Sequence, residues 1–195
     1  MTNVDDPKND EEFAAVHVKP PEVLDGPVIL VDYDPAWSDL YEREEVRIRA
    51  ALDHRVLLIE HVGSTSVPGL AAKPKIDILL VVPDSGNEPN YVPALEAMGY
   101  VLRIREPNWH EHRVFGGPDT AVNLHVFSNG CEEVERLLRF RDHLRGSESD
   151  RLLYASTKRA LAQETWKYTQ NYADAKGIVV EEILARSDRT PSPRT

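Results

Sequence analysis

The sequence predicts an α+β protein in which helices cover a mixed β-sheet. Segments dense in β-branched and apolar residues, as strands are, occur at 28–31, 56–62, 76–82, 100–104 and 113–127. The last segment contains a Gly-Gly-Pro-Asp turn and therefore predicts two strands. From Cys131 to Leu184 the apolar residues recur at helical spacing, with breaks near Gly146 and Gly177. Strands that come first and helices that come last are typical of this fold class.

Two helices are expected before residue 100. In the first, over residues 32–52, Asp34 is suited to the N-cap and Pro35 to the first helical position. One face of that helix is apolar and consists of Trp37, Leu40, Tyr41, Ile48, Ala51 and Leu52. The second helix runs over residues 91–98 and ends at Gly99.

We expect one ordered domain over residues 27–186. Its length is enough to bury a substantial core. Residues 1–26 are acidic and contain Pro and Gly, and residues 187–195 read SDRTPSPRT. Both ends therefore have the composition of disordered tails.

Charge and cysteine content restrict the classes of function. The chain carries 23 basic and 33 acidic residues, a formal net charge of −10. General nucleic-acid binding requires the opposite excess, so any anion contact must be a local basic pocket. Cys131 is the only cysteine, which excludes an internal disulfide framework. The sequence shows neither a secretion signal at its start nor an apolar run of the ~20 residues that a membrane helix needs. We expect a cytoplasmic protein that does not contact membranes.

The connection between two of the predicted strands, HVGSTSVPGL over residues 61–70, has two interpretations. A Gly-Ser turn at the end of a strand can direct backbone N–H groups and hydroxyls toward one point, which suits a phosphate. Alternatively, the glycines only shape a connection, and Ser64 and Ser66 bond to the loop backbone. Both interpretations stay open at this point.

Three familiar motifs do not fit. A P-loop has Lys and then Ser or Thr after its second glycine, whereas Leu70 follows here. Neither serine of the turn has the flanking glycines of a hydrolase nucleophile. Tyr154 and Lys158 have the spacing found in short-chain dehydrogenases, but no glycine-rich dinucleotide turn lies near the start of the predicted domain.

The sequence has a Gly-Ser pair, then twelve residues, and then an acid, Asp77, on an apolar strand. This pattern resembles that of the DNA polymerase beta type nucleotidyltransferases. In that superfamily the Gly-Ser turn holds nucleotide phosphates and strand carboxylates hold divalent metal. The wider sequence resembles that of the GrpB family, whose members are small proteins also found fused to dephospho-coenzyme A kinase. The matching stretches are LVDYDPAW, IEHVGSTSVPGLAAKPKIDILLVV, NLHVF and RFRDHLR. The resemblance covers about residues 27–186 and implies a nucleotidyltransferase-like fold.

The resemblance also implies roles for single residues. Gly63, Ser64 and Ser66 would hold phosphates, and Asp77 would act in catalysis as a metal ligand. Superfamily members with transferase activity carry two acids two positions apart on this strand, whereas Leu79 stands at the second position here. A site with a single metal and a non-catalytic site both stay open.

Further ligands are expected on the strand over residues 123–127, where Asn123 and His125 share one face. The GrpB-like pattern has His-x-His at this place, so Asn123 replaces the first histidine. Asp77, His125 and Asn123 would bind a divalent ion, Mg²⁺, Mn²⁺ or Zn²⁺. Asp77 and His125 are the expected catalytic residues.

Other histidines lie near the turn and between later strands. His61 comes just before the turn, and the family pattern favours it as a phosphate ligand over Glu60, which points to the opposite strand face. In WHEHR, residues 109–113, His110 and His112 lie between two predicted strands. We expect an exposed loop there.

Basic residues must offset the charge of a phosphate. Lys73 and Lys75 lie between the turn and Asp77, and Lys73 is the one that matches the family. On the helix predicted from residue 131, Arg141 falls in the middle of the apolar face and so points inward. Its partner would be Asp77, a carbonyl or a phosphate, unless its head reaches water. We expect Lys73 and Arg141 to bind phosphate.

These expectations define two candidate functions. In the first, the protein binds a nucleoside triphosphate or another phosphate-bearing small molecule with a divalent metal and transfers a nucleotidyl group to a small acceptor. In the second, it is a non-catalytic accessory or folding-assistance domain for a protein partner, associated with coenzyme A biosynthesis. Leu79 favours the second function, and Asp77 with His125 favours the first.

Overall fold

The computed structural model describes residues 15–18 and 26–187. Its centre is a five-stranded sheet with the order β1-β2-β5-β4-β3. The strands are β1 (Leu58–Val62), β2 (Ile76–Val82), β3 (Val101–Glu106), β4 (His112–Gly116) and β5 (Val122–Ser128). β2 and β5 are parallel, and the other neighbours are antiparallel. The predicted α+β class with a mixed sheet is confirmed.

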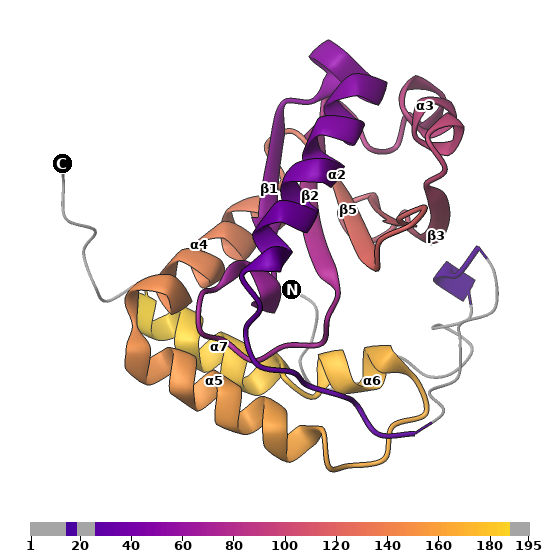
Figure 1. Ribbon diagram of the computed structural model, residues 1–195. Coiled ribbons are helices and arrows are strands. Elements are labelled where there is room, and N and C mark those ends of the chain that lie inside the picture. Colours follow the sequence, from indigo (N-terminus) through magenta and orange to yellow (C-terminus); the bar gives the residue numbers. More distant parts are fainter. Residues whose placement is uncertain (1–14, 19–25, 188–195) are drawn as a thin grey trace, which may run out of the picture.

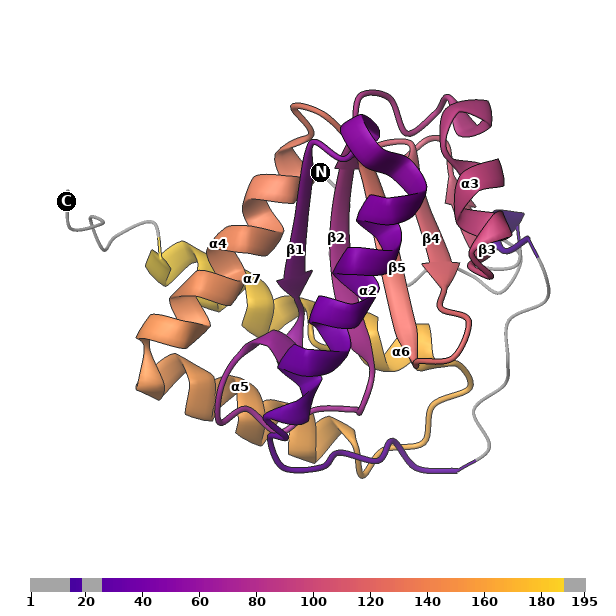
Figure 2. The same ribbon diagram turned by 45° about the horizontal axis from the view of Figure 1, so that its top comes forward.

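Helices cover both faces and one end of this sheet. Their bounds are α2 (Ala36–Leu52), α3 (Val92–Ala97), α4 (Glu132–Gly146), α5 (Glu148–Leu161), α6 (Thr169–Asp174) and α7 (Gly177–Ser187). Short 3₁₀ turns are η1 (Asp53–Arg55), η2 (Ser64–Ser66) and η3 (Glu88–Asn90). Figure 1 shows α2 along one face of the sheet and α5 and α7 grouped below its end. The turned view in Figure 2 places α4 beside β1 and away from α2.

The two faces of β2 pack against different helices because successive side chains of a strand point in opposite directions. The even-numbered residues of β2 belong to the main core with α2 and α3, namely Ile76, Ile78, Leu80 and Val82. Leu79 and Val81 face the other way and pack with residues of α4. Asp77 shares this second face, as do Asn123 and His125 of β5.

Most predicted elements are present with shifted ends. The strand predicted at 76–82 has these bounds in the structure. The first helix begins at Ala36, whose backbone N–H donates to Oδ1 of Asp34 (2.9 Å). The apolar face of this helix contacts the core as expected. The helical region after Cys131 has one more break than predicted, between α5 and α6.

The strand predicted at 28–31 is wrong. Only Val31 pairs, through one isolated bridge to Ala72, and Ile29 is 69% exposed. Ala72 lies in the connection between β1 and β2, so no sheet strand is available to extend the pairing. Apolar content alone cannot produce a ladder without a partner strand.

The predicted tails fall largely outside the described residues, since these omit 1–14, 19–25 and 188–195. Residues 15–18 are an exception to the disorder predicted for 1–26. His17 forms an antiparallel bridge with Ile104, and the N–H of Val18 donates to the carbonyl of Arg103 (2.9 Å). Within the described ranges, no helix has the length and apolar character needed to cross a bilayer.

Candidate functional site

Asp77, Asn123 and His125 come together at one end of the sheet. β2 and β5 run parallel, so residues near their starts are neighbours, and Asp77 pairs with Asn123. The Asn123 Nδ2 donates to Asp77 Oδ1 (2.9 Å), and His125 Nε2 lies 3.9 Å from the same oxygen. The side chains of Asp77 and His125 are 30% and 28% exposed. The sequence-predicted trio therefore forms one cluster that a small ligand can reach.

The environment of Asp77 favours its charged form. Burial raises the pKa of the carboxyl group, but the nearby His125 ring, the Asn123 amide and the charge of Lys176 outweigh this effect. The pKa of Asp77 is consequently lowered from its ordinary value. Asp77 is an anion at neutral pH.

The Gly63 turn lies directly against Asp77. Gly63 has φ +70° and ψ −172°, a conformation open essentially to glycine alone. A Cβ at this position would lie 2.4 Å from Asp77 Oδ2. The backbone of the turn therefore approaches the carboxylate closely because residue 63 has no side chain.

The hydroxyls of the turn divide into two groups. Ser64 Oγ accepts a hydrogen bond from Lys158 Nζ (2.9 Å), beside the cluster. Ser66 Oγ instead donates to the Gly63 carbonyl (2.6 Å), and this residue is only 5% exposed. The phosphate role predicted for Ser66 thus has no geometric support, since its hydroxyl closes the turn.

Three lysines lie within electrostatic range of Asp77, and the sequence favoured only Lys73 among them. Burial lowers the pKa of Lys73, Lys158 and Lys176, and the negative charge of Asp77 opposes this shift only in part. Lys158 is 2% exposed and has a pKa near 7. Its Nζ also donates to the Ala71 carbonyl (2.5 Å). Lys73 and Lys176 are half-buried.

The sequence did not indicate Lys158 and Lys176 as main basic residues of the site. Lys158 was a weaker candidate, because its helix is apolar on several sides and gives no clear facing, and its spacing with Tyr154 lacks the dinucleotide turn of short-chain dehydrogenases. Tyr154 does belong to this neighbourhood, because Lys158 Nζ lies 4.9 Å from its ring centroid. Lys176 lies between α6 and α7, about 100 residues from Asp77, and no local pattern marks it.

His61 is not part of this cluster. It pairs with Ile78, and its side chain lies on the α2 face of the sheet, opposite to Asp77. Its ring stacks on Tyr41 (centroids 4.9 Å apart), and its Nε2 is 3.0 Å from Thr65 Oγ1. Burial lowers its pKa to about 4. The predicted phosphate role is corrected, because strand alternation directs this side chain to the other face.

Arg141 points inward as predicted, with 8% exposure, but it has other partners. Its Nη1 donates to Glu60 Oε2 (2.7 Å) and to the His61 carbonyl (3.1 Å), and its Nε donates to Asp142 Oδ1 (2.7 Å). These contacts join α4 to β1. The expected carbonyl partner is present, and the expected phosphate role is replaced by a structural one.

His112 does not lie in an exposed loop. It is the first residue of β4 and is 5% exposed. Its Nε2 is 3.1 Å from Nδ1 of His125, so His112 contacts the His125 ring through the nitrogen that does not face Asp77. The loop that we expected is confined to residues before it, where His110 and Glu111 have positive φ. The apolar residues that follow His112 were a local sign that the strand could begin at this residue and not after it.

The position at which the sequence resemblance implies a second acid is occupied by a fully buried side chain. Leu79 is 0% exposed and packs with Val62, Val81 and Phe127. In the part of the chain described, no group of three or more His, Cys, Asp or Glu residues could hold a metal. Asp77 and His125 nevertheless fit a single ion, because ligands that each lie ~2 Å from one ion can be 3.9 Å apart. The remaining ligands would come from phosphates or water.

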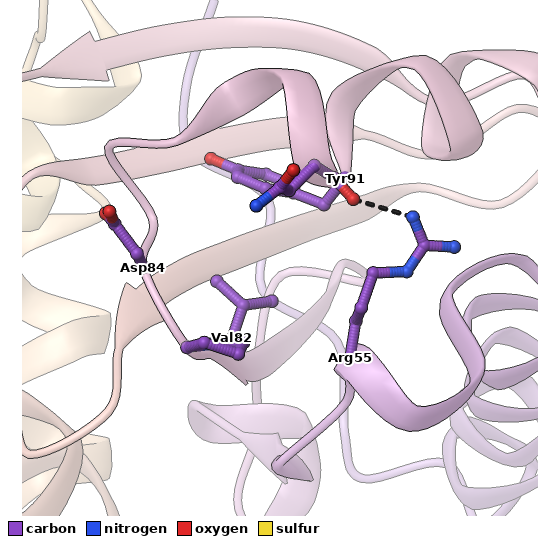
Figure 3. A pocket seen from close by; sticks show the side chains of 6 residues that line it. Arg55, Val82, Asp84 and Tyr91 are labelled. Atoms are coloured by element: carbon purple, nitrogen blue, oxygen red, sulfur yellow. Dashed lines mark hydrogen bonds between the residues drawn. The ribbon is translucent and has the colours of Figure 1, made fainter.

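A pocket lies at the opposite end of β2 (Figure 3). It has a volume of about 40 Å³ and is lined by Arg55, Val82, Pro83, Asp84, Asn90 and Tyr91. Arg55 spans it and donates to the Asn90 carbonyl (2.6 Å). Ligand pockets have volumes of roughly 300–1,000 Å³, so this one is too small for a nucleotide.

The mixed five-stranded sheet and the helices that cover it define a protein of the α+β class. The chain belongs to the GrpB family. The family description "GrpB protein" matches residues 27–186, and the resemblance found in the sequence is confirmed.

Comparisons with individual proteins agree with this family. A UPF0157 protein of Halalkalibacterium halodurans is 56% identical over 184 residues, which cover 94% of each chain. The crystal structure of the conserved protein GrpB from Enterococcus faecalis gives a TM-score of 0.68 at 30% identity, covering 81% of this chain and 98% of that one. A dephospho-CoA kinase of Mycolicibacterium paratuberculosis is 29% identical, and the match covers 73% of this chain and 41% of the kinase. A structure of the Cid1 poly(U) polymerase gives a TM-score of 0.42 at 11% identity, covering 66% of this chain and 45% of that one.

Proposed function

We propose that the protein binds a nucleoside triphosphate, or another phosphate-bearing small molecule, together with one divalent cation at the Asp77 cluster. The observation that carries this proposal is the contact of the Gly63 turn with Asp77, where an added Cβ would meet Oδ2 at 2.4 Å. Because the turn lies directly against the carboxylate, phosphates held by its backbone N–H groups would share a cation with Asp77.

The cation would be held by Asp77 and His125, with the Asn123 amide as a further donor. Carboxylate and imidazole together suit Mn²⁺ or Zn²⁺, and Mg²⁺ binds through one carboxylate when phosphates supply other oxygens. A bound divalent ion would offset the charge of the phosphate oxygens and polarise them.

The phosphates would lie between the Gly63 turn and the lysines. Ser64 supplies a hydroxyl, and Lys73 and Lys176, both partly accessible, supply positive charge next to Asp77. Lys158 is too buried to reach a ligand and orients Ser64 instead. In a transfer reaction, an acceptor would attack the α-phosphorus in line with the leaving pyrophosphate, and these groups would hold the triphosphate for that attack.

Isothermal titration tests this proposal. ATP and the other nucleoside triphosphates are titrated with Mg²⁺ or Mn²⁺ into the full chain and into Asp77→Asn and His125→Ala. Matched controls are Asp53→Asn and His54→Ala, two neighbouring residues with side chains 88% and 84% exposed at the far end of α2. We expect metal-dependent binding that both cluster variants weaken at least tenfold and neither control changes. Binding that is absent, or indifferent to both cluster variants, contradicts the proposal.

A specific observation supports the second candidate function. Leu79 is buried in the core beneath α4, where a superfamily transferase carries its second acid. A part of a dephospho-CoA kinase is also similar to this chain. The alternative is a non-catalytic domain that assists the folding of such a partner.

A refolding assay separates the two functions. Denatured dephospho-CoA kinase is diluted with and without the chain, and the recovered kinase activity is measured. The alternative predicts a higher yield that Asp77→Asn leaves intact. An unchanged yield contradicts it.

We also propose a cytoplasmic location, because the single cysteine suits a reducing compartment. Fractionation of cells that produce the chain tests this, and recovery in an extracellular fraction contradicts it.

A further inference from the structure

A chain of hydrogen bonds runs from β3 through β4 to the Asp77 cluster. Glu106 Oε2 lies 2.8 Å from His112 Nδ1, and His112 Nε2 lies 3.1 Å from His125 Nδ1. The remaining nitrogen of His125, Nε2, faces Asp77 Oδ1 at 3.9 Å. The chain of hydrogen bonds therefore passes through one side chain on each of three neighbouring strands and ends at His125 Nε2, the nitrogen that faces the site.

The geometry of the two imidazoles favours a genuine hydrogen bond between them. Their planes differ by 5°, and their centroids are 5.3 Å apart. That separation is close to the N···N distance plus the two ring radii, so the rings lie nearly in one plane and end to end rather than one above the other. An N–H of one ring is then aimed along the lone pair of the other.

His112 is held rigidly in this arrangement. Its ring stacks on Phe127 (centroids 4.5 Å apart, 13° between planes) and meets the edge of Trp109 at 5.2 Å. The His112 and Glu106 side chains are 7% and 13% exposed. Because aromatic side chains and a carboxylate hold the ring in place, the position of its Nε2 is well defined.

Hydrogen-bond capacity then determines which nitrogen of His125 carries the proton. A carboxylate only accepts, so Nδ1 of His112 carries a hydrogen toward Glu106. When His112 is neutral, as in mildly alkaline buffer, its other nitrogen is an acceptor, so His112 Nε2 receives the Nδ1–H of His125. At 3.9 Å, His125 Nε2 is too far from Asp77 Oδ1 for a hydrogen bond, so this carboxylate does not hold the proton, and the lone pair of a neutral His125 is left on Nε2.

We propose that His112 is a positioning residue that fixes the Nδ1–H tautomer of His125 and so presents an unprotonated Nε2 to the site. The tautomer itself does not depend on a ligand, whereas its use as a cation ligand rests on the proposed function. Ring nitrogens that bind metal are commonly oriented in this way by a hydrogen bond on the other nitrogen.

Nitrogen NMR of the metal-free, full-length protein tests the proposal. Long-range ¹H–¹⁵N correlation spectra in mildly alkaline buffer report which nitrogen of each neutral histidine is protonated, and loss of signals in His125→Gln and His112→Gln assigns the two rings. We expect His125 to be protonated on Nδ1. A proton on Nε2 of His125 in the parent protein overturns the proposal.

Two substitutions of His112 separate positioning from packing. His112→Phe keeps the aromatic ring but removes the acceptor, so the His125 proton should move to Nε2, which free imidazole side chains favour. His112→Gln offers an amide oxygen in nearly the same place and should retain the Nδ1–H form. If His112→Phe leaves the tautomer unchanged, the proposal is wrong. If His112→Phe does not fold, the spectra of the parent and of His112→Gln still decide.

Titration with Mn²⁺ alone connects the tautomer to the site. We expect His112→Phe to lose about 10–100-fold in affinity, as is typical when the partner of a metal-bound histidine is removed, and His112→Gln to recover much of it. Equal affinity of parent and His112→Phe contradicts the use of this nitrogen as a ligand. A parent that binds no Mn²⁺ while His125 carries its proton on Nδ1 supports the tautomer and contradicts the proposed function, so the two failures are distinguishable.

Discussion

At the scale of single residues, the contact between Gly63 and Asp77 is the central feature of the site. The positive φ of Gly63 and the absence of a side chain allow the turn to pass within van der Waals range of the carboxylate. Both properties are required together, because a side chain at this position would be strained by its backbone and would also displace Asp77.

We expect Gly63→Ala to lower the free energy of unfolding by about 2–4 kcal/mol, the sum of backbone strain and the clash with Asp77. Gly69→Ala is the matched control. Gly69 also has positive φ (+78°), but nothing lies within 4 Å of an added Cβ, so only strain is introduced. Urea denaturation measures both. Equal losses in the two variants would argue against a close contact between the turn and Asp77.

Lys158 makes stability depend on pH. Burial lowers its pKa from the ordinary 10.5 to about 7, so between these values the unfolded chain binds a proton that the folded protein lacks. When the unfolded state binds more protons, the free energy of unfolding rises with pH, here by at most ~1.4 kcal/mol per pH unit. We therefore expect the parent to gain stability from pH 7 to 10 relative to Lys158→Met, measured by urea denaturation at each pH. Parallel curves for the two proteins would contradict a buried amine with a lowered pKa.

At the scale of elements, α4 is joined to β1 by Arg141. Its Nη1 bridges Glu60 and the His61 carbonyl, which belong to the strand that leads into the Gly63 turn. The arginine therefore positions the strand before the site through the hydrogen bonds of its Nη1.

Arg141→Met tests this structural role. We expect a loss of about 1–3 kcal/mol in the free energy of unfolding, because the buried His61 carbonyl loses its charged donor. Nucleotide affinity should stay unchanged under conditions in which the variant is folded. Arg139→Met, an exposed position on the same helix, is the control. A variant with normal stability and weakened nucleotide binding would restore the phosphate role predicted from the sequence.

Leu79 stands where the sequence resemblance implies a second acid, and its burial shows why one substitution cannot supply that acid. Its side chain is fully buried beneath α4, so Leu79→Asp places a carboxylate among apolar side chains. We expect a loss of more than about 3 kcal/mol and no gain in Mn²⁺ affinity. Leu79→Met, which keeps the volume, should cost less than about 1.5 kcal/mol. A stable Leu79→Asp variant that binds a second Mn²⁺ would contradict this interpretation.

The sequence predicted elements well where the local pattern and the tertiary partner agree. The apolar run at 76–82 forms β2 with the predicted bounds because it has a partner on each side. The run at 28–31 has similar composition but lies over a connection, so it forms a single bridge. Periodicity also predicted that Arg141 is inward, but it could not identify Glu60 as its partner, because that partner is 81 positions away.

At the scale of the whole molecule, the excess of acidic over basic residues determines which anions can approach. With a net charge of −10, the protein can attract a phosphate only through a local group of basic residues, and the proposed site beside Asp77 depends on such a group. A long polyanion would instead face the repulsion of the entire surface.

We therefore expect no binding of a random-sequence DNA duplex in fluorescence anisotropy at low salt, under conditions in which titration detects a nucleoside triphosphate. Low salt is the strictest test, because it strengthens any electrostatic attraction. Duplex binding that weakens steeply as salt is added would contradict this prediction and point to a basic surface.

The sequence by itself determined the fold class, the GrpB family, the Gly63-Ser64 turn and its spacing to Asp77, because these follow from local patterns read along the chain. Only the tertiary structure decided which residues share the site. Strand alternation directs His61 to the face opposite Asp77, and helix packing brings Lys158 and Lys176 from distant positions to the cluster. The pairing of β4 with β5 brings His112 behind His125. Such long-range contacts depend on how the elements pack, which no single stretch of sequence encodes.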